Sequence, residues 1–185
     1  MQIRSRRLTL LVFVLACLFV NVIFAAKKPQ LTDKYSLDFV RENLIPLEQY
    51  KPYPKIEDRD FWDNLPEDIK NNIIEMAEKS LKEPWPLLKA TVYLQFDQNG
   101  NRRNYESPYF SRRNKLDKLM LAELVENKGR FVNDIIDGTW LILEEATWTL
   151  PAHFNIGSLP FPGEKSVALF TAETAGLLAW VDYFM

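Results

Sequence analysis

The chain has 185 residues, of which 47% are hydrophobic and 26% are charged, a balance that is typical of a folded globular protein and excludes a disordered one. Its formal net charge of -2 at pH 7 argues against a nucleic-acid-binding domain, which would usually be basic. We therefore expect one domain of ordinary size and no nucleic-acid partner.

Residues 1–26 have the pattern of a targeting segment. Arginines near the start precede an almost continuous apolar run over residues 8–24, and Ala25-Ala26 offers a cleavage site. The pattern predicts a cleaved signal peptide and export to the periplasm or the medium. The alternative is an uncleaved membrane anchor over residues 8–26, a stretch that is just long enough to cross a bilayer.

The single cysteine, Cys17, lies inside this segment, so the mature chain would have no thiol. Export without disulfides is compatible with a bacterial envelope or secreted protein that is stabilised by its core. One histidine and no mature thiol argue against a zinc site. The sequence also contains no Walker loop, dinucleotide fingerprint or HExxH motif. We expect no cofactor and no metal.

Residues 27–57 are polar and rich in proline, which predicts a linker with one short helix over Ser36–Asn43. Residues 58–185 form the predicted domain. Its first long helix starts near Pro66 and ends at about Leu81, because apolar residues recur between them at helical spacing. Apolar and polar residues then alternate over Leu88–Phe96, which predicts a short strand or an extended segment, followed by a turn.

The next predicted helix has Ser107 as its cap and Pro108 in its first turn, and it continues to about Asn127. Its predicted buried residues are Leu116, Leu119, Met120 and Leu124. The link from Asn127 to Gly129 is so short that the following helix must return antiparallel.

That following helix is predicted over Arg130–Leu150 and should end before Pro151. It is apolar on every side around residues 140–143, so we expect it to be covered on all sides. The final helix, over Ser166–Phe184, is also nearly apolar all round. We expect either a missing C-terminal part or a partner chain to cover that helix.

Two groups of residues could carry chemistry. In the first, Trp148 falls in the last turn of the predicted helix, with Glu145 beside it and His153 just beyond it. An indole can stack on a sugar ring, and an imidazole can act as an acid or as an anion ligand. The alternative is structural, with Trp148 in the core and His153 at a helix end.

The second group is a run of basic and aromatic residues over positions 102–118, which includes Tyr109, Arg112 and Arg113. Guanidinium groups suit bidentate contacts to carboxylates or sulfates, and tyrosines add stacking. In an exported protein this pattern favours an acidic polysaccharide as the partner. The alternative is a solvated helix face with local ion pairs such as Arg113–Asp117.

An ordered string of short motifs covers roughly residue 58 to the C-terminus. It consists of Tyr93-Leu94-Gln95-Phe96, Gly100-Asn101-Arg102, Tyr105-Glu106-x-Pro108-Tyr109-Phe110-x-Arg112-Arg113, Leu119-x-Leu121-Ala122-Glu123, Lys128-Gly129-Arg130-Phe131, Asp134-Ile135-Ile136-Asp137-Gly138-x-Trp140, Glu144-Glu145-x-x-Trp148-x-x-Pro151-Ala152-His153 and Thr171-Ala172-Glu173-Thr174-Ala175. This string resembles the N-terminal part of the heparinase II/III-like polysaccharide lyases of bacteria. Each motif alone would be weak, whereas their order is fairly specific.

The resemblance implies a mainly α fold, with antiparallel helical hairpins that form part of an incomplete α/α toroid. It also implies cleavage of uronic-acid polysaccharides by β-elimination, with a Tyr/His pair typically handling the proton transfers. The chain departs from the family because it stops after about two hairpins, before the expected catalytic residues. We therefore expect an N-terminal fragment that is inactive alone, and we assign no catalytic residue. The alternative is a non-catalytic carbohydrate-binding or helical interaction module. The expected substrate-binding residues are Trp148, His153, Glu145, Arg112, Arg113 and Tyr109.

Overall fold

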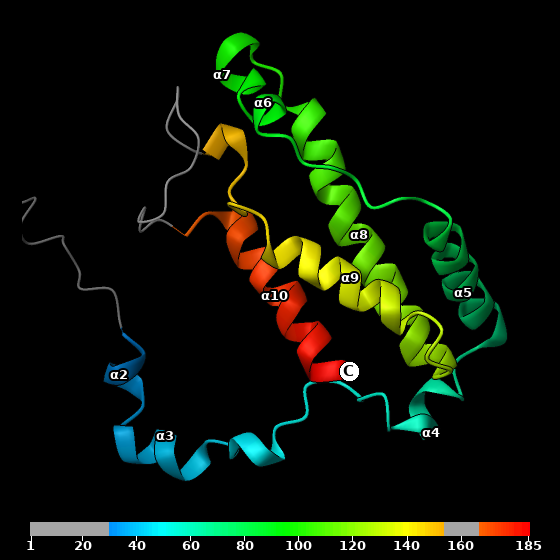
Figure 1. The fold of residues 1–185 in the computed structure, drawn as a ribbon. Helices are drawn as coiled ribbons and strands as arrows, with labels where there is room; N and C mark the ends of the chain where they lie inside the picture. The colour runs from blue at the N-terminus through cyan, green and yellow to red at the C-terminus, as the bar shows by residue number, and fades with distance from the viewer. Residues whose placement is uncertain (1–29, 154–166) are drawn as a thin grey trace, which may run out of the picture. The chain divides into compact units, whose positions relative to one another are not determined.

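The structure is a computed structural model, and it describes residues 30–153 and 167–185 (Figure 1). These residues form helices and loops and no strand, so this part of the chain is mainly α-helical, as predicted. No helix among them is long and apolar enough to cross a membrane. The predicted targeting segment over residues 1–26 lies outside the described residues. The chain divides into two units, between Tyr50 and Lys51.

The described part of the first unit contains two short α-helices and one 3-10 turn. They are α2 (Leu31–Lys34), α3 (Leu37–Asn43) and η1 (Leu47–Gln49), and none of them contains a buried residue. The Ser36 hydroxyl accepts a hydrogen bond from the backbone N–H of Phe39 at 3.1 Å, which caps α3. The predicted helix in this region is confirmed.

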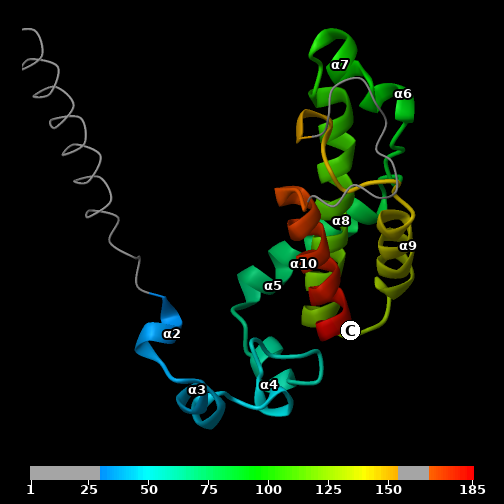
Figure 2. The same ribbon diagram turned by 90° about the vertical axis from the view of Figure 1, so that its left-hand side faces the viewer.

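The second unit is built around one long helix, α8 (Arg103–Glu126) (Figures 1 and 2). Helix α5 (Glu67–Leu81), helix α9 (Val132–Leu143) and helix α10 (Leu169–Phe184) all pack against it. A shorter helix, α4 (Arg59–Trp62), precedes α5. The residues predicted to be buried on the central helix are in the core, because Leu116, Leu119, Met120 and Leu124 are all buried.

Helix α8 begins at Arg103, four residues before the predicted cap at Ser107, so that prediction was wrong. The Asn101 side chain accepts the backbone N–H of Asn104 at 3.1 Å and thereby satisfies a donor at the true N-terminus. Pro108 then lies inside the helix, in its second turn. The hydrogen bond to Asn101, the residue before the N-cap Arg102, therefore outweighs the usual preference of proline for the first turn.

The link between α8 and α9 is tight, as predicted, and α9 returns antiparallel to α8 (Figures 1 and 2). Asn127 and Gly129 adopt positive φ angles of 49° and 75°. The carboxylate of Glu123 accepts the backbone N–H of Gly129 at 2.5 Å and that of Phe131 at 3.1 Å. This carboxylate thus fixes the hairpin by satisfying two N–H groups at the start of the returning helix.

We expect Glu123→Gln to lower the free energy of unfolding by about 1–2 kcal/mol, because an amide has a single acceptor oxygen and cannot accept both the buried N–H of Phe131 and the N–H of Gly129. Glu123 is only 1% exposed, so water cannot replace the lost acceptor. Urea denaturation measures the change. The control is Glu75→Gln, which removes an exposed pair with Lys79 and should cost about 0.5 kcal/mol or less. Equal losses in the two variants would contradict the role of Glu123.

Helix α9 ends at Leu143, well before the predicted end at Leu150. The Ile142 carbonyl, which would accept the N–H of residue 146 in a longer helix, instead accepts the Trp148 indole N–H at 2.8 Å. The backbone N–H of Glu145 also bonds to this carbonyl, at 3.3 Å, which tightens the last turn. A side-chain hydrogen bond from six residues along the chain therefore ends the helix, and Pro151 does not.

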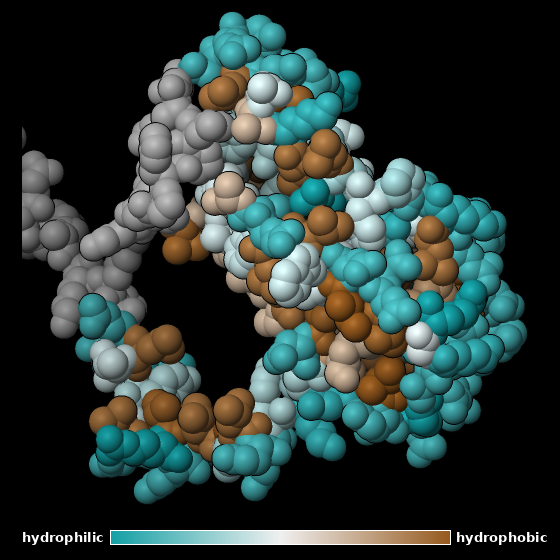
Figure 3. All heavy atoms as spheres, in the orientation of Figure 1, coloured by the Kyte–Doolittle hydropathy of each residue, from teal (hydrophilic) through white to brown (hydrophobic). Residues whose placement is uncertain are grey.

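One face of α9 is exposed, so the prediction that this helix is covered on all sides was wrong. Ile136, Trp140 and Leu143 are 58%, 62% and 58% exposed. They recur at helical spacing and so form one stripe, which we call the α9 stripe. Apolar surface is visible over this helix in the space-filling view (Figure 3). The opposite face of α9 packs on α8 through Ile135 and Ile142.

The strand predicted over Leu88–Phe96 is wrong, because this stretch is helical. It forms α6 (Ala90–Tyr93) and the start of α7 (Gln95–Asn99). The described residues offer no strand with which it could pair. The backbone donors of Tyr93 and Leu94 are satisfied locally, by the carbonyls of Lys89 and Ala90, both at 3.1 Å. Gly100, with a φ of 74°, ends α7.

Helix α10 begins at Leu169 rather than at the predicted Ser166, which lies outside the described residues. It buries Thr174, Val181 and Phe184, while Leu169 on its first turn is exposed. The Tyr183 hydroxyl donates to the carbonyl of Tyr53 at 2.9 Å and so ties the end of the helix to the start of the second unit.

Candidate functional site

A buried group of charged side chains joins α8 to the segment that follows α9. Arg113 donates two hydrogen bonds to the carboxylate of Glu145, at 2.7 and 3.1 Å, and Arg112 donates a third at 3.1 Å. All three side chains are at most 10% exposed. Bidentate arginine–carboxylate pairs of this kind are strong and directional. The carboxylate of Glu145 therefore sits between two guanidinium groups inside the protein.

Two more side chains extend this group toward α10. The Tyr109 hydroxyl donates to the carbonyl of Trp148 at 2.9 Å and lies 3.0 Å from Thr174 Oγ1. Arg113 Nε donates to the same threonine oxygen at 2.9 Å. The Arg113 guanidinium carbon also lies 3.3 Å from the centre of the Tyr109 ring. We call Tyr109, Arg112, Arg113, Glu145 and Thr174 together the Arg–Glu hub.

The second predicted group is a solvated helix face only at its start, where Arg102 and Arg103 are exposed and Arg102 pairs with Glu106. Arg112 and Arg113 are buried, and the partner of Arg113 is Glu145 rather than the predicted Asp117. Lys115 of the same run is buried as well, with its Nζ donating to the carbonyl of Glu83 at 2.7 Å. Basic residues inside a helix bundle are placed where carboxylates and carbonyls can satisfy their donors.

The first predicted group does not come together as a unit. Glu145 belongs to the hub, and Trp148 contributes its backbone carbonyl there. The Trp148 indole is half-buried and packs against the core, which supports the structural alternative for that residue. His153 is exposed on the short 3-10 helix η2 (Pro151–His153), and its ring lies 5.3 Å from that of Phe170. The imidazole therefore lies beside α10 and not beside Glu145.

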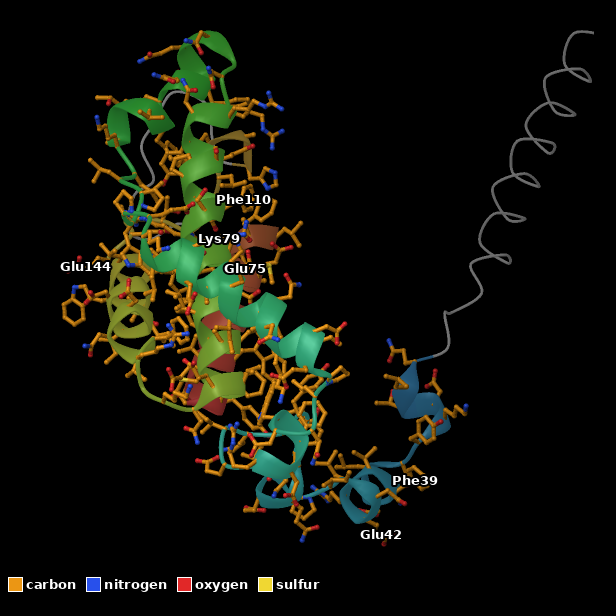
Figure 4. All side chains as sticks on the ribbon, turned by 90° about the vertical axis from the view of Figure 1, so that its right-hand side faces the viewer. Phe39, Glu42, Glu75, Lys79, Phe110 and Glu144 are labelled. Atoms are coloured by element: carbon orange, nitrogen blue, oxygen red, sulfur yellow. The ribbon has the colours of Figure 1, made fainter. Side chains whose placement is uncertain are left out.

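A pocket of about 480 Å³ lies next to the hub, between α6, α8 and the segment after α9. We call it the tyrosine pocket, because Tyr93 and Tyr105 line it together with Arg112 and Glu145 of the hub. Glu144, which Figure 4 shows at the C-terminal end of α9, contributes a further carboxylate. The apolar part of the lining includes Leu87, Leu88 and Leu141.

The two tyrosines pack edge to face, with ring centres 4.9 Å apart and an interplanar angle of 86°. The Tyr93 hydroxyl donates to the carbonyl of Thr149 at 3.2 Å. Burial, followed by the nearby charge of Glu145, raises the pKa of the Tyr105 hydroxyl well above its ordinary value. Tyr105 therefore stays protonated at neutral pH and can donate a hydrogen bond.

Sequence reasoning did not assign two of these residues to a site. Tyr93 was predicted to lie on a strand, and Thr174 only to lie on the final helix. The family string includes both positions, so their presence in it was a usable signal. Glu144 stands beside Glu145 in that string, but its place in the lining of the tyrosine pocket depends on where α9 ends.

The described residues contain no group of three or more His, Cys, Asp or Glu side chains that could hold a metal ion. The chain matches no protein-family model and no curated protein. The family expectation therefore rests on the motif string given above.

Proposed function

We propose that this chain forms part of the α/α toroid of an exported heparinase II/III-like polysaccharide lyase and helps to hold a uronic-acid-containing polymer there. The observation that carries the proposal is the Arg–Glu hub. Its residues come from three separate motifs of the family string, and Tyr109 and Thr174 meet across 65 positions of sequence. Motifs that are far apart in the chain but form one buried hydrogen-bonded group are expected when the string encodes a common scaffold.

Within this proposal the role of the hub is that of a scaffold. Both guanidinium groups are held in place by the single carboxylate of Glu145, and they are buried. The hub instead fixes the end of α9 against α8 and α10, and so shapes the tyrosine pocket beside it. Exposed cations such as Arg103 can attract an acidic polymer, although salt in the solvent limits this attraction to a short range.

In β-elimination, a base removes the proton at C5 of the uronate and the bond to the leaving oxygen at C4 breaks, which yields an unsaturated uronate. Proton transfer needs a donor or acceptor within hydrogen-bond reach of the reacting atoms. We assign none of these steps to residues of this chain. The proposed contribution of the chain is to bind and orient the polymer.

The test is retention of the full chain on heparan sulfate and alginate gels at low salt, together with the absorbance of unsaturated uronate. We expect retention that declines with added salt, and no turnover. Arg103→Gln should weaken retention, whereas Arg41→Gln in the first unit is the matched control. Failure to bind either gel at low salt would contradict the binding role, and robust turnover would contradict the lack of a catalytic role.

The α9 stripe favours a second candidate function, that of a helical interaction subunit. Its three large apolar side chains are exposed along one helix, as is common at protein–protein contacts. Sedimentation at increasing protein concentration distinguishes this candidate. Assembly that is lost in Trp140→Gln would favour an interaction subunit, whereas a monomer at all concentrations would count against self-association through this stripe.

A further inference from the structure

We infer that the tyrosine pocket binds a short segment of sugar chain, whose oxygen atoms accept hydrogen bonds from the Tyr105 hydroxyl and from Nη2 of Arg112. The inference rests on the proposed function and deepens it, because it names the place where the polymer is held and two groups that contact it. The accepting oxygen can belong to a sugar hydroxyl or to a uronate carboxylate, and affinity measurements distinguish these two sources. The support comes from two buried donors without partners, from the cavity that they share, and from the lining around them.

The first donor is the Tyr105 hydroxyl. Tyr105 is 6% exposed, and its hydroxyl makes no hydrogen bond to any residue that the structure describes. Burial raises the pKa of this hydroxyl, so it keeps its proton at neutral pH. A buried hydroxyl without a partner costs free energy, and a ligand oxygen that accepts a hydrogen bond from it offsets this cost.

The second donor belongs to Arg112, which is also 6% exposed. Its Nε donates to the carbonyl of Pro86 at 2.7 Å, and its Nη1 donates to the carbonyl of Leu141 at 3.2 Å and to Glu145 at 3.1 Å. Nη2 has no hydrogen-bond partner among the residues that the structure describes. The guanidinium group is therefore held in one position while the N–H donors of Nη2 stay available to a ligand.

Both donors are open to the same cavity. In the described part of the chain, the unpaired side-chain atoms that are sealed from solvent are Trp85 Nε1 and Thr139 Oγ1, so solvent reaches both the Tyr105 hydroxyl and Nη2 of Arg112. The two residues line the tyrosine pocket together. They lie about two turns apart on α8 and thus on the same side of that helix. A sugar chain in the pocket can therefore accept hydrogen bonds from both.

The remaining lining suits a sugar ring. Tyr93 offers aromatic surface, and Leu87 and Leu88 offer aliphatic surface, both of which can cover the C–H groups of a pyranose. The carboxylate of Glu144 can accept hydrogen bonds from ring hydroxyls. The pocket thus combines donors, an acceptor and apolar surface, and its volume of about 480 Å³ lies within the usual range for small-ligand pockets.

The test is titration calorimetry of the full chain with two sets of short oligosaccharides, one neutral and one containing uronates. Tyr105→Phe should weaken the binding of each set that binds by about fivefold, as expected for the loss of one hydrogen bond. The variant keeps the ring and removes no hydrogen bond within the described part of the chain, so the fold should be unchanged. Tyr50→Phe, at an exposed position of the first unit, is the matched control and should bind as the wild type does.

A second pair of variants tests the place of binding without removing a hydrogen bond. Ala90 is exposed at the start of α6 and lines the pocket, so Ala90→Phe should fill part of the cavity and weaken binding by about tenfold. Ala172 is exposed on α10 and does not line the pocket, so Ala172→Phe should leave the affinity unchanged. Unchanged affinity in both Tyr105→Phe and Ala90→Phe would overturn the inference.

The same titrations distinguish the two kinds of accepting oxygen. A hydroxyl acceptor predicts similar affinities for the two sets and little dependence on salt. A carboxylate acceptor predicts tighter binding of the uronates, which declines with added salt. Either result supports the inference when the binding depends on Tyr105, whereas a chain that binds neither set contradicts it.

The outcomes also separate this inference from the proposed function. If the acidic gels retain the chain but the binding of both sets is independent of Tyr105 and Ala90, the pocket assignment is wrong and the polymer-binding role stands. If oligosaccharides bind through Tyr105 but no acidic gel retains the chain, the pocket assignment stands and the lyase proposal loses its support.

Discussion

Replacing Glu145 with alanine should lower the free energy of unfolding by about 3–5 kcal/mol, because it leaves two buried guanidinium groups without a counter-charge. Arg112 and Arg113 both donate to this carboxylate, and neither side chain is more than 10% exposed. Water can approach these cations only through the pocket that Arg112 lines, so it replaces little of the lost counter-charge. The change is measured by urea denaturation of wild type and variant.

The neighbouring residue Glu144 provides the matched control. Glu144→Ala removes the same side chain one position earlier, from an exposed site without an ion pair in the described part of the chain. It should change stability by about 0.5 kcal/mol or less. A triple variant with apolar residues at positions 112, 113 and 145 should recover much of the loss, since no buried charge then remains. Similar losses for Glu144→Ala and Glu145→Ala would overturn the hub as a major source of stability.

Replacing Gly138 with alanine should destabilise the protein by about 2–3 kcal/mol, because the new methyl group overpacks the interface between α9 and Trp85. A Cβ at this position would lie 2.3 Å from Trp85 Cη2 and 2.5 Å from Cζ2. The indole cannot retreat easily, since Lys115 Nζ lies 4.5 Å from its ring centre and prolines flank Trp85 on both sides. Thermal and urea unfolding measure the loss.

Gly176 provides the matched control for Gly138→Ala, because it is also a glycine inside a helix. A Cβ there would meet nothing within 4 Å. Gly176→Ala should therefore stabilise the protein by about 0.5–1 kcal/mol, through the better helix propensity of alanine. The two substitutions are chemically identical, and they should change stability in opposite directions. A gain from Gly138→Ala would show that Trp85 does not approach α9 as closely as the structure has it.

Local patterns in the sequence were sufficient for much of the fold. The helix α5, the buried positions on α8 and the tight link before α9 were all predicted, and the structure confirms them. The buried stripe predicted for α5 is confirmed only in part, because Ala77 and Ser80 are buried whereas Ile69 and Met76 are exposed. Each depends on spacing along a single helix or on a very short connection. Such features are governed by helical periodicity and backbone geometry within a few residues, and distant parts of the chain change them little.

Two of the errors occur where side-chain hydrogen bonds that the apolar pattern does not reveal are made. The predicted strand is replaced by helical turns, where the described part of the chain has no strand to pair with and the Tyr93 hydroxyl donates to the Thr149 carbonyl. Helix α9 ends early because the Trp148 indole, six residues along the chain, donates to the Ile142 carbonyl. Alternating apolar residues and the proline at position 151 were weaker determinants than these hydrogen bonds.

In the candidate site, too, some features could be predicted from the sequence and others depend on the folded structure. The sequence by itself supplied its residue types and their order, including the arginine pair on α8, the acidic pair after α9 and the family string that links them. Only the tertiary structure decided their roles, because charge neutralisation depends on distances between segments. The structure pairs Arg112 and Arg113 with Glu145 inside the protein, a contact that no local pattern in the sequence reveals.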